Sequence, residues 1–132
     1  MSLRSVVRRR ILVVEDDPSV AGLVSDFFSS EGHEVDTAPN GRLALERLRA
    51  ADYDLIVSDM RMPELDGEGF FAALDAVRPG MRWRIIFVTG QALTPETREF
   101  IARARVPLLA KPFDLDTLRE MTEEMLAPQS GR

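Results

Sequence analysis

Four short apolar runs in this sequence each end abruptly at polar or charged residues. The runs cover residues 11–14, 55–57, 85–88 and 106–110. They are followed by Glu15-Asp16-Asp17, Ser58-Asp59, Thr89-Gly90 and Lys111-Pro112, respectively. Runs without apolar–polar alternation are typical of strands covered on both faces. If these strands are parallel and adjacent, the carboxyl, hydroxyl and ammonium groups at their ends meet at one edge of the sheet.

Amphipathic segments separate the apolar runs and predict helices. Asp17-Pro18 is a helix start with Asp17 as N-cap, and Thr94 and Asp114 are expected to cap later helices. The first helix is expected to place its apolar side chains inward at helical spacing; these are Val20, Leu23, Val24, Phe27 and Phe28. With a fifth, more polar strand expected at residues 33–38, strand and helix alternate five times, which predicts an α/β fold: a doubly wound five-stranded parallel sheet with five helices in three layers.

The expected domain spans residues 10–126. Residues 1–9 are interpreted as a disordered lead-in or cloning remnant, and residues 127–132 as a C-terminal tail. The segment 33–38 is expected to be a more polar edge strand that includes His33, which we interpret as a structural residue rather than a phosphoryl carrier. Trp83 is expected to be a packing residue.

Composition excludes several kinds of function. The 132 residues contain no cysteine, so disulfides and thiolate metal sites are absent, and a cytoplasmic location is expected. The net charge of −5 disfavours nucleic-acid binding, even with the arginines at positions 8–10. No apolar run is long enough to span a membrane, so we expect no membrane contact.

The three carboxyl groups of Glu15, Asp16 and Asp59 are the strongest chemical signal. Two like charges about 5 Å apart repel by roughly 3 kcal/mol at an effective dielectric near 20, so such a cluster holds protons or binds a cation. Oxygen-only ligands suit Mg²⁺. Asp16 and Asp59 are the expected direct ligands, with Glu15 acting through a water molecule.

These motifs together resemble the receiver domain of two-component response regulators. The matching residues are Glu15-Asp16, the loop Asp59-Met60-Arg61-Met62-Pro63-Glu64-Leu65-Asp66-Gly67, Thr89 and Lys111-Pro112. The resemblance implies the flavodoxin-like strand order 2-1-3-4-5 and a phosphorylation-dependent signalling switch. The segment 89–113 is similar to receivers attached to hybrid histidine kinases.

The resemblance also implies a role for each matched residue. Asp59 is the phosphoacceptor, Lys111 and Thr89 contact the phosphoryl group together with the Met60 N–H, and the backbone carbonyl of Arg61 completes the Mg²⁺ site. The peptide bond before Pro112 is expected to be cis. The implied donor is a phosphohistidine on a histidine kinase or a histidine phosphotransfer protein.

The chain as a whole is then expected to be a monomer or weak dimer that promotes its own phosphorylation and dephosphorylation without being a turnover enzyme. It would act on an output domain or a covalently linked kinase. The expected response is a change in the surface formed by the fourth helix, fifth strand and fifth helix.

One position departs from the family pattern. Receivers usually carry Tyr or Phe three residues before the lysine, and here that residue is Leu108. The signal is therefore expected to pass through residues 89–93 and the fourth helix. Arg61 and Gln91 are expected to influence hydrolysis of the acyl phosphate.

Three other functions fit parts of the pattern. A haloacid dehalogenase-type phosphatase also uses a strand-end aspartate with magnesium, but the general acid two residues on would be Arg61, which cannot donate a proton. A flavin binder lacks the expected phosphate loop, because Glu15-Asp16-Asp17 stands there. A receiver fold used only for protein interaction is favoured by Leu108 alone.

Overall fold

The computed structural model describes residues 8–61, 65–90 and 93–127, in which strands and helices alternate from end to end. The elements are β1 (Arg10–Val14), α1 (Pro18–Ser30), β2 (Glu34–Ala38), α2 (Gly41–Ala50), β3 (Leu55–Asp59), α3 (Gly67–Val77), the 3₁₀ turn η1 (Met81–Trp83), β4 (Ile85–Thr89), α4 (Pro95–Ala104), β5 (Leu108–Ala110) and α5 (Leu115–Leu126).

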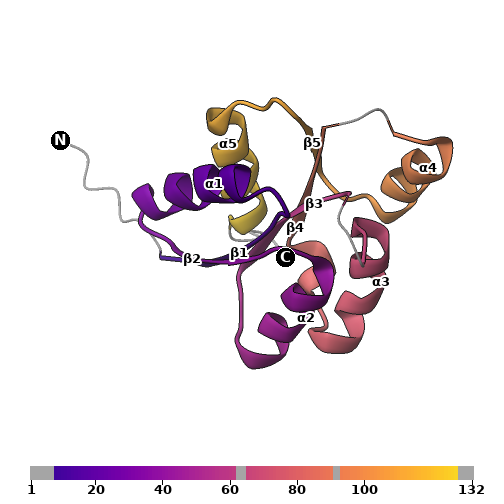
Figure 1. The fold of residues 1–132 in the computed structure, drawn as a ribbon, viewed down its shortest axis with the longest axis horizontal. Coiled ribbons are helices and arrows are strands. Elements are labelled where there is room, and N and C mark those ends of the chain that lie inside the picture. Colours follow the sequence, from indigo (N-terminus) through magenta and orange to yellow (C-terminus); the bar gives the residue numbers. More distant parts are fainter. Residues whose placement is uncertain (1–7, 62–64, 91–92, 128–132) are drawn as a thin grey trace.

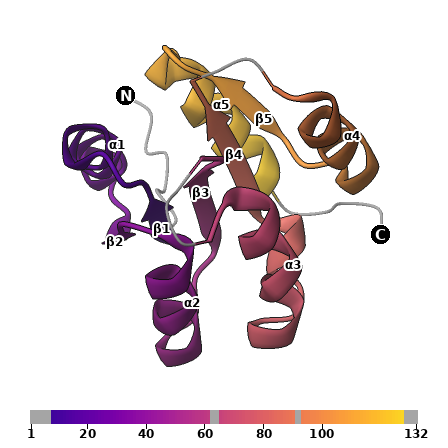
Figure 2. The same cartoon turned by 45° about the vertical axis from the view of Figure 1, so that its right-hand side comes forward.

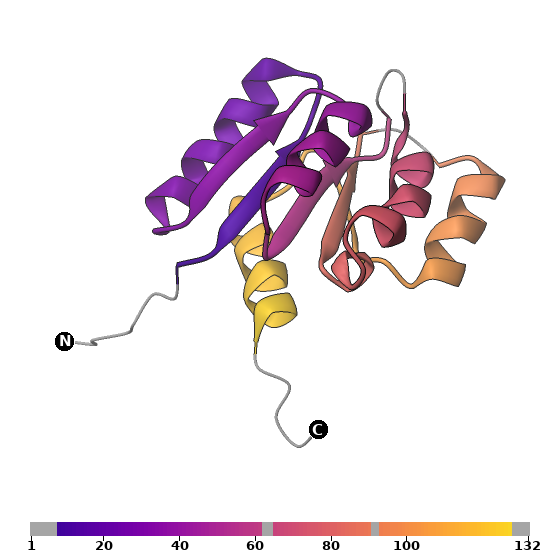
Figure 3. The same cartoon turned by 90° about the horizontal axis from the view of Figure 1, so that it is seen from below.

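The five strands form one parallel sheet in the order β2-β1-β3-β4-β5, which confirms the expected fold. Helices α1 and α5 cover one face of the sheet, and α2, α3 and α4 cover the other (Figures 1 and 2). Viewed from below, α2, α3 and α4 follow one another in a row (Figure 3). The order reverses between β1 and β3, where open α/β sheets bind their ligands.

The central strands supply a separate core to each face. Successive strand residues point to opposite faces, so Leu12 and Ile56 pack with α2–α4, whereas Ile11 and Val57 pack with α1 and α5. All of these side chains are almost completely buried. This two-sided packing fixes the register of the strands, and the register fixes which side chain stands at each strand end.

The helix starts agree with the sequence prediction. The side chains of Asp17, Thr94 and Asp114 each accept a hydrogen bond from a backbone N–H in the first turn of α1, α4 and α5. Proline is the first residue of both α1 and α4, where its missing N–H costs nothing. Side-chain capping and proline at the first position therefore determine where these helices begin, a few residues after the strand ends.

Three side-chain or boundary predictions are wrong. Leu23 is 54% exposed, because the buried stripe of α1 runs through Ala21, Val24 and Phe28. Trp83 is 66% exposed on η1, with the Arg82 guanidinium 5.0 Å from its ring centroid. The second strand begins at Glu34 rather than His33.

His33 instead belongs to the turn that leaves α1. Its N–H donates to the Phe28 carbonyl of that helix, and its Nδ1 accepts the Arg9 N–H at 3.1 Å. Burial lowers its pKa, which keeps the ring neutral. It lies at the amino end of the strands, opposite the acidic cluster, as the structural interpretation requires.

Replacing Arg105 by glycine is expected to stabilise the protein by about 1 kcal/mol. Arg105 ends α4 with φ of 57°, and it is the one non-glycine residue with positive φ among those described. Glycine adopts this conformation without strain from a Cβ. The matched change Arg103→Gly, inside the same helix, is expected to destabilise by about 1 kcal/mol. Urea unfolding measures both, and a loss of stability in the Arg105 variant would contradict the assignment.

Candidate functional site

The acidic side chains predicted from the sequence meet at the carboxyl edge of the sheet. Glu15 follows β1, Asp59 ends β3, and one carboxylate oxygen from each of Glu15, Asp16 and Asp59 lies within 4.8 Å of the others. Asp59 is 7% exposed and Glu15 is 6% exposed, whereas Asp16 faces solvent. The cluster is therefore anchored in the core and open on one side.

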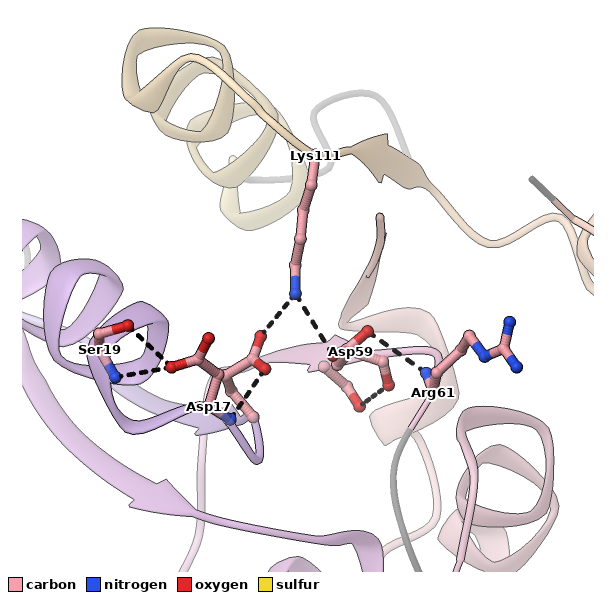
Figure 4. A network of polar contacts seen from close by, with 7 residues as sticks. Asp17, Ser19, Asp59, Arg61 and Lys111 are labelled. Atoms are coloured by element: carbon pink, nitrogen blue, oxygen red, sulfur yellow. Dashed lines mark hydrogen bonds and ion pairs between the residues drawn. The ribbon is translucent and has the colours of Figure 1, made fainter. Parts of the chain in front are cut away.

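Lys111, which directly follows β5, bridges two of these carboxylates. Its Nζ lies 3.1 Å from Oε1 of Glu15 and 3.3 Å from Oδ2 of Asp59 (Figure 4). Its backbone N–H donates to the Thr89 carbonyl at 2.7 Å, which continues the β4–β5 pairing beyond Ala110. The lysine is thus fixed at its backbone and at its ammonium group. It is also the only lysine in the sequence.

Two groups in the cluster, Glu15 and Lys111, have raised pKa values. Burial raises the pKa of Glu15, against the hydrogen bonds from Lys111 and from the Asp17 N–H. For Lys111, burial opposes the charged form, but the hydrogen bond to Glu15 and the charge of Asp59 outweigh it and raise the pKa. The ammonium is therefore charged at neutral pH and partly offsets the repulsion among the carboxylates.

The other Asp59 contacts come from the loop after β3. The Arg61 N–H donates to Oδ1 of Asp59 at 3.3 Å (Figure 4). The Met60 N–H donates to the Val88 carbonyl at 2.9 Å, so it is used by the sheet. The Met60 N–H, predicted to contact the phosphoryl group, is thus already bound to Val88, because sheet pairing continues one residue past the end of β3. The backbone amide that contacts Asp59 is that of Arg61.

Neighbouring aspartates after β1 have different surroundings. Asp17 caps α1 through hydrogen bonds from the Ser19 N–H and hydroxyl at 3.0 and 2.8 Å, and these bonds lower its pKa (Figure 4). Its own N–H donates to Oε2 of Glu15. Asp16 joins the acidic cluster and Asp17 does not. The interpretation of Asp17 as a structural cap agrees with this geometry.

Thr89 stands at the end of β4, one strand away from Asp59. It is buried and lines a pocket of about 360 Å³ together with Arg61, Leu93 and Thr97. The pocket thus lies between the loop after β3 and the start of α4. The peptide bond between Lys111 and Pro112 is cis, as the resemblance implied. Gln91 and residues 62–64 of the loop lie outside the described residues.

The donor set fits Mg²⁺. All the side chains in the cluster offer carboxylate oxygens, and the exposure of Asp16 leaves room for the water molecules that Mg²⁺ retains. Asp16 and Asp59 would bind the ion directly and Glu15 through water. Both oxygens of Glu15 already accept hydrogen bonds, from Lys111 and from the Asp17 N–H, which favours the indirect role.

Asp16→Asn is expected to weaken Mg²⁺ binding at least about tenfold, because it removes the charge of a direct ligand. Asp17→Asn is the matched control: asparagine caps a helix as well as aspartate does. The control removes one exposed charge and is expected to change the affinity about fivefold or less. Titration calorimetry with magnesium chloride measures both variants. Equal losses would show that only net charge matters.

Comparison with known families identifies this arrangement. Residues 11–123 match the family described as the response regulator receiver domain. The chain belongs to this family. The transcriptional regulatory protein GlrR of Escherichia coli K12 is 34% identical over 116 residues, which cover 88% of this chain and 26% of GlrR. The chain therefore spans about a quarter of the length of GlrR.

Receivers of sensor kinases are similar to the same degree. The sensor kinase CckA of Brucella abortus is 35% identical over 121 residues, or 90% of this chain and 13% of CckA. The receiver domain of the sensor histidine kinase PA1611 of Pseudomonas aeruginosa, solved with a magnesium ion in its active-site cleft, is 30% identical. Its TM-score is 0.80, and the match covers 92% of this chain and 100% of that one. The resemblance to kinase-attached receivers is thus supported.

Proposed function

We propose that this receiver is a phosphorylation-dependent switch in which Asp59 accepts a phosphoryl group from a phosphohistidine. The observation that carries the proposal is the position of the Asp59 carboxylate. It lies at the end of the central strand, within the acidic cluster, and is bound by the only lysine of the chain. Phosphoryl transfer needs positioning and charge neutralisation more than covalent catalysis, and this site provides both.

The transfer is a single displacement at phosphorus. One Asp59 oxygen forms the new P–O bond while the P–N bond to the donor imidazole breaks, and the released imidazole nitrogen takes up a proton. The product is an acyl phosphate on Asp59. The second carboxylate oxygen can keep the hydrogen bond from the Arg61 N–H, which now lies 3.3 Å from Oδ1. That contact orients the nucleophile before the donor arrives.

The surrounding residues stabilise charge on the phosphoryl oxygens. The ammonium of Lys111 moves from the Asp59 carboxylate to the phosphoryl oxygens as negative charge develops there. It can do so because it stands on a flexible side chain. The Thr89 hydroxyl donates a hydrogen bond to a second phosphoryl oxygen. Mg²⁺, held by Asp16, Asp59, the Arg61 backbone carbonyl and, through water, Glu15, supplies charge neutralisation when it is bound.

The response is proposed to pass from Thr89 into α4. Thr89 lines the 360 Å³ pocket with Leu93 and Thr97, so a shift of its hydroxyl toward the phosphoryl group acts directly on the start of α4. Leu108 is only partly buried and has no ring to move inward. The α4–β5–α5 surface would change as packed elements adjust together.

An aromatic cluster ties β4 to α4 below this pocket. Its members are Phe71 of α3, Phe87 of β4 and Phe100 of α4, with ring centroids 5.4 to 6.2 Å apart. Phe87 is two residues before Thr89 on the same strand. Displacement of the strand end is therefore transmitted to α4 through rings in direct contact, a route that does not need an aromatic residue at position 108.

The domain extends, in this proposal, over residues 10–126, acts in the cytoplasm and takes its phosphoryl group from a histidine kinase or a histidine phosphotransfer protein. The domain is phosphorylated and dephosphorylated in signalling, and it does not turn over a substrate. Among the described residues, none of the helices has the length and hydrophobicity that a membrane crossing requires.

The test is a measurement of intact mass after incubation with a small acyl phosphate. With Mg²⁺ the protein is expected to gain one phosphoryl group, and with the metal chelated the gain is expected to fall below detection. Circular dichroism checks that both samples are folded. A folded protein that gains nothing in Mg²⁺ would contradict the proposal and support a receiver used only for protein interaction.

A further inference from the structure

Leu65 of the loop between β3 and α3 lies in a notch formed by two glycines. Helices α2 and α3 lie side by side on one face of the sheet (Figure 2), Gly41 begins α2, and Gly69 stands in the first turn of α3. A Cβ built on Gly41 would stand 2.9 Å from the Leu65 carbonyl oxygen and 3.2 Å from its Cβ and Cδ2. A Cβ built on Gly69 would stand 2.7 Å from Cδ1 of Leu65.

The space that these glycines leave matters more than their backbone conformation. Among the described glycines, only Gly32 and Gly80 have positive φ, so other residues can adopt the main-chain conformation of Gly41 and Gly69. The two contacts with Leu65 differ, however. Gly69 faces the end of a flexible side chain, which can turn aside. Gly41 faces a backbone carbonyl, which can move only if the loop itself moves.

Hydrogen bonds connect Leu65 to the phosphoacceptor. Two residues after Leu65, the Gly67 N–H donates to the Met60 carbonyl at 2.9 Å, so the end of the loop is joined to its start. Met60 is followed by Arg61, whose N–H donates to Oδ1 of Asp59 at 3.3 Å. A shift of the Leu65 backbone is therefore passed to the peptide group of Arg61.

The position of that peptide group is critical for the site. Its N–H bond to Asp59 is already long at 3.3 Å, so a displacement of a few tenths of an ångström breaks it. The carbonyl of Arg61 is the proposed backbone ligand of Mg²⁺. This ion requires near-octahedral geometry with ligands at about 2.0–2.1 Å, so the same displacement weakens its binding.

We infer that Gly41 is a positioning residue, located in α2, that sets the place of the Arg61 peptide group through Leu65. The inference rests on the proposed function for its effect on Mg²⁺, and on geometry alone for the placement of the loop. The three atoms nearest to a Cβ at Gly41 all belong to Leu65, so Gly41 acts through that residue.

The test measures Mg²⁺ binding by titration calorimetry. Gly41→Ala is expected to weaken it about tenfold, as the loss of a group that supports a metal ligand does. Gly69→Ala is expected to have the smaller effect of the two, because the Leu65 side chain can turn aside. Gly22→Ala is expected to bind as the wild type does, since its added Cβ has no atom within 4 Å.

A further control separates the position of the loop from stability. Leu48→Val shortens a fully buried side chain two turns further along α2. It is expected to lower the resistance to urea and to keep the wild-type affinity for Mg²⁺. Gly41→Ala is expected to show the loss of affinity while circular dichroism reports a folded protein, which a merely structural role would not produce.

A second readout depends neither on the metal nor on phosphorylation. In ¹⁵N-labelled protein without Mg²⁺, the backbone amide signal of Arg61 is expected to move in Gly41→Ala and to stay in place in Gly22→Ala. If the wild type takes up no phosphoryl group, the proposed function fails and the NMR comparison still decides the role of Gly41. An unmoved Arg61 signal, or a loss of Mg²⁺ affinity no larger than that of Leu48→Val or Gly69→Ala, would overturn the inference.

Discussion

Asp59→Asn is expected to abolish the Mg²⁺-dependent gain of a phosphoryl group. The amide cannot form the acyl phosphate, and the change also removes the charge of one of the direct metal ligands. Because asparagine has almost the same shape, it can still accept the Arg61 N–H bond that Oδ1 accepts at 3.3 Å. The fold is therefore expected to survive, and intact mass together with circular dichroism measures the two properties on one sample.

Asp54→Asn is the matched control for that variant. Asp54 immediately precedes β3, at the opposite end of the strand from Asp59, and accepts the Arg10 N–H at 2.9 Å. Its loss removes the same charge from the same strand without touching the site. We expect wild-type phosphorylation. A phosphoryl gain in Asp59→Asn equal to that of the control would show that the acceptor lies elsewhere.

Lys111→Met is expected to slow phosphorylation about 100-fold, because it removes a preorganised cation from the place where negative charge moves during transfer. The same change is expected to strengthen Mg²⁺ binding. The ammonium now neutralises Glu15 and Asp59 at 3.1 and 3.3 Å, so its loss leaves these carboxylates with only the metal as a counter-charge. A lower phosphorylation rate together with a higher Mg²⁺ affinity is expected only for a cation that contacts the carboxylates of the metal site.

Acyl phosphate uptake and magnesium titration on the same preparation measure the two effects. Arg84→Met removes a cation near the amino end of the sheet, where the guanidinium reaches the Asp54 carbonyl, and is expected to change neither property. If Lys111→Met lowered metal affinity and rate together, the lysine would be acting through the structure of the site and not through its charge.

Much of the site follows from strand ends alone. The apolar runs before Glu15, Asp59 and Thr89 identify buried parallel strands, and parallel strands bring their carboxyl ends to one edge. The capping role of Asp17 also follows from its local sequence, because an aspartate before a proline is a helix start. The strand order came from the resemblance to receivers, since periodicity does not determine which strands are neighbours.

What the sequence did not predict depends on register and on tertiary contacts. The Met60 N–H, predicted to contact the phosphoryl group, is bound to Val88 one residue beyond the end of β3, and the Arg61 N–H is the one that reaches Asp59. Helical spacing at Leu23 allows either an inward or an outward side chain, and the arrangement of α1 on the sheet makes it outward.

The most direct test of the account is to locate the phosphoryl group chemically. Protein phosphorylated by a small acyl phosphate in Mg²⁺ would be treated with sodium borohydride, which reduces an aspartyl phosphate to homoserine, and then digested and analysed by mass spectrometry. The account predicts homoserine at position 59 and unmodified aspartate at positions 16 and 17. Homoserine at another position, or a stable phosphoryl group on a hydroxyl or on His33 with position 59 unchanged, would contradict it.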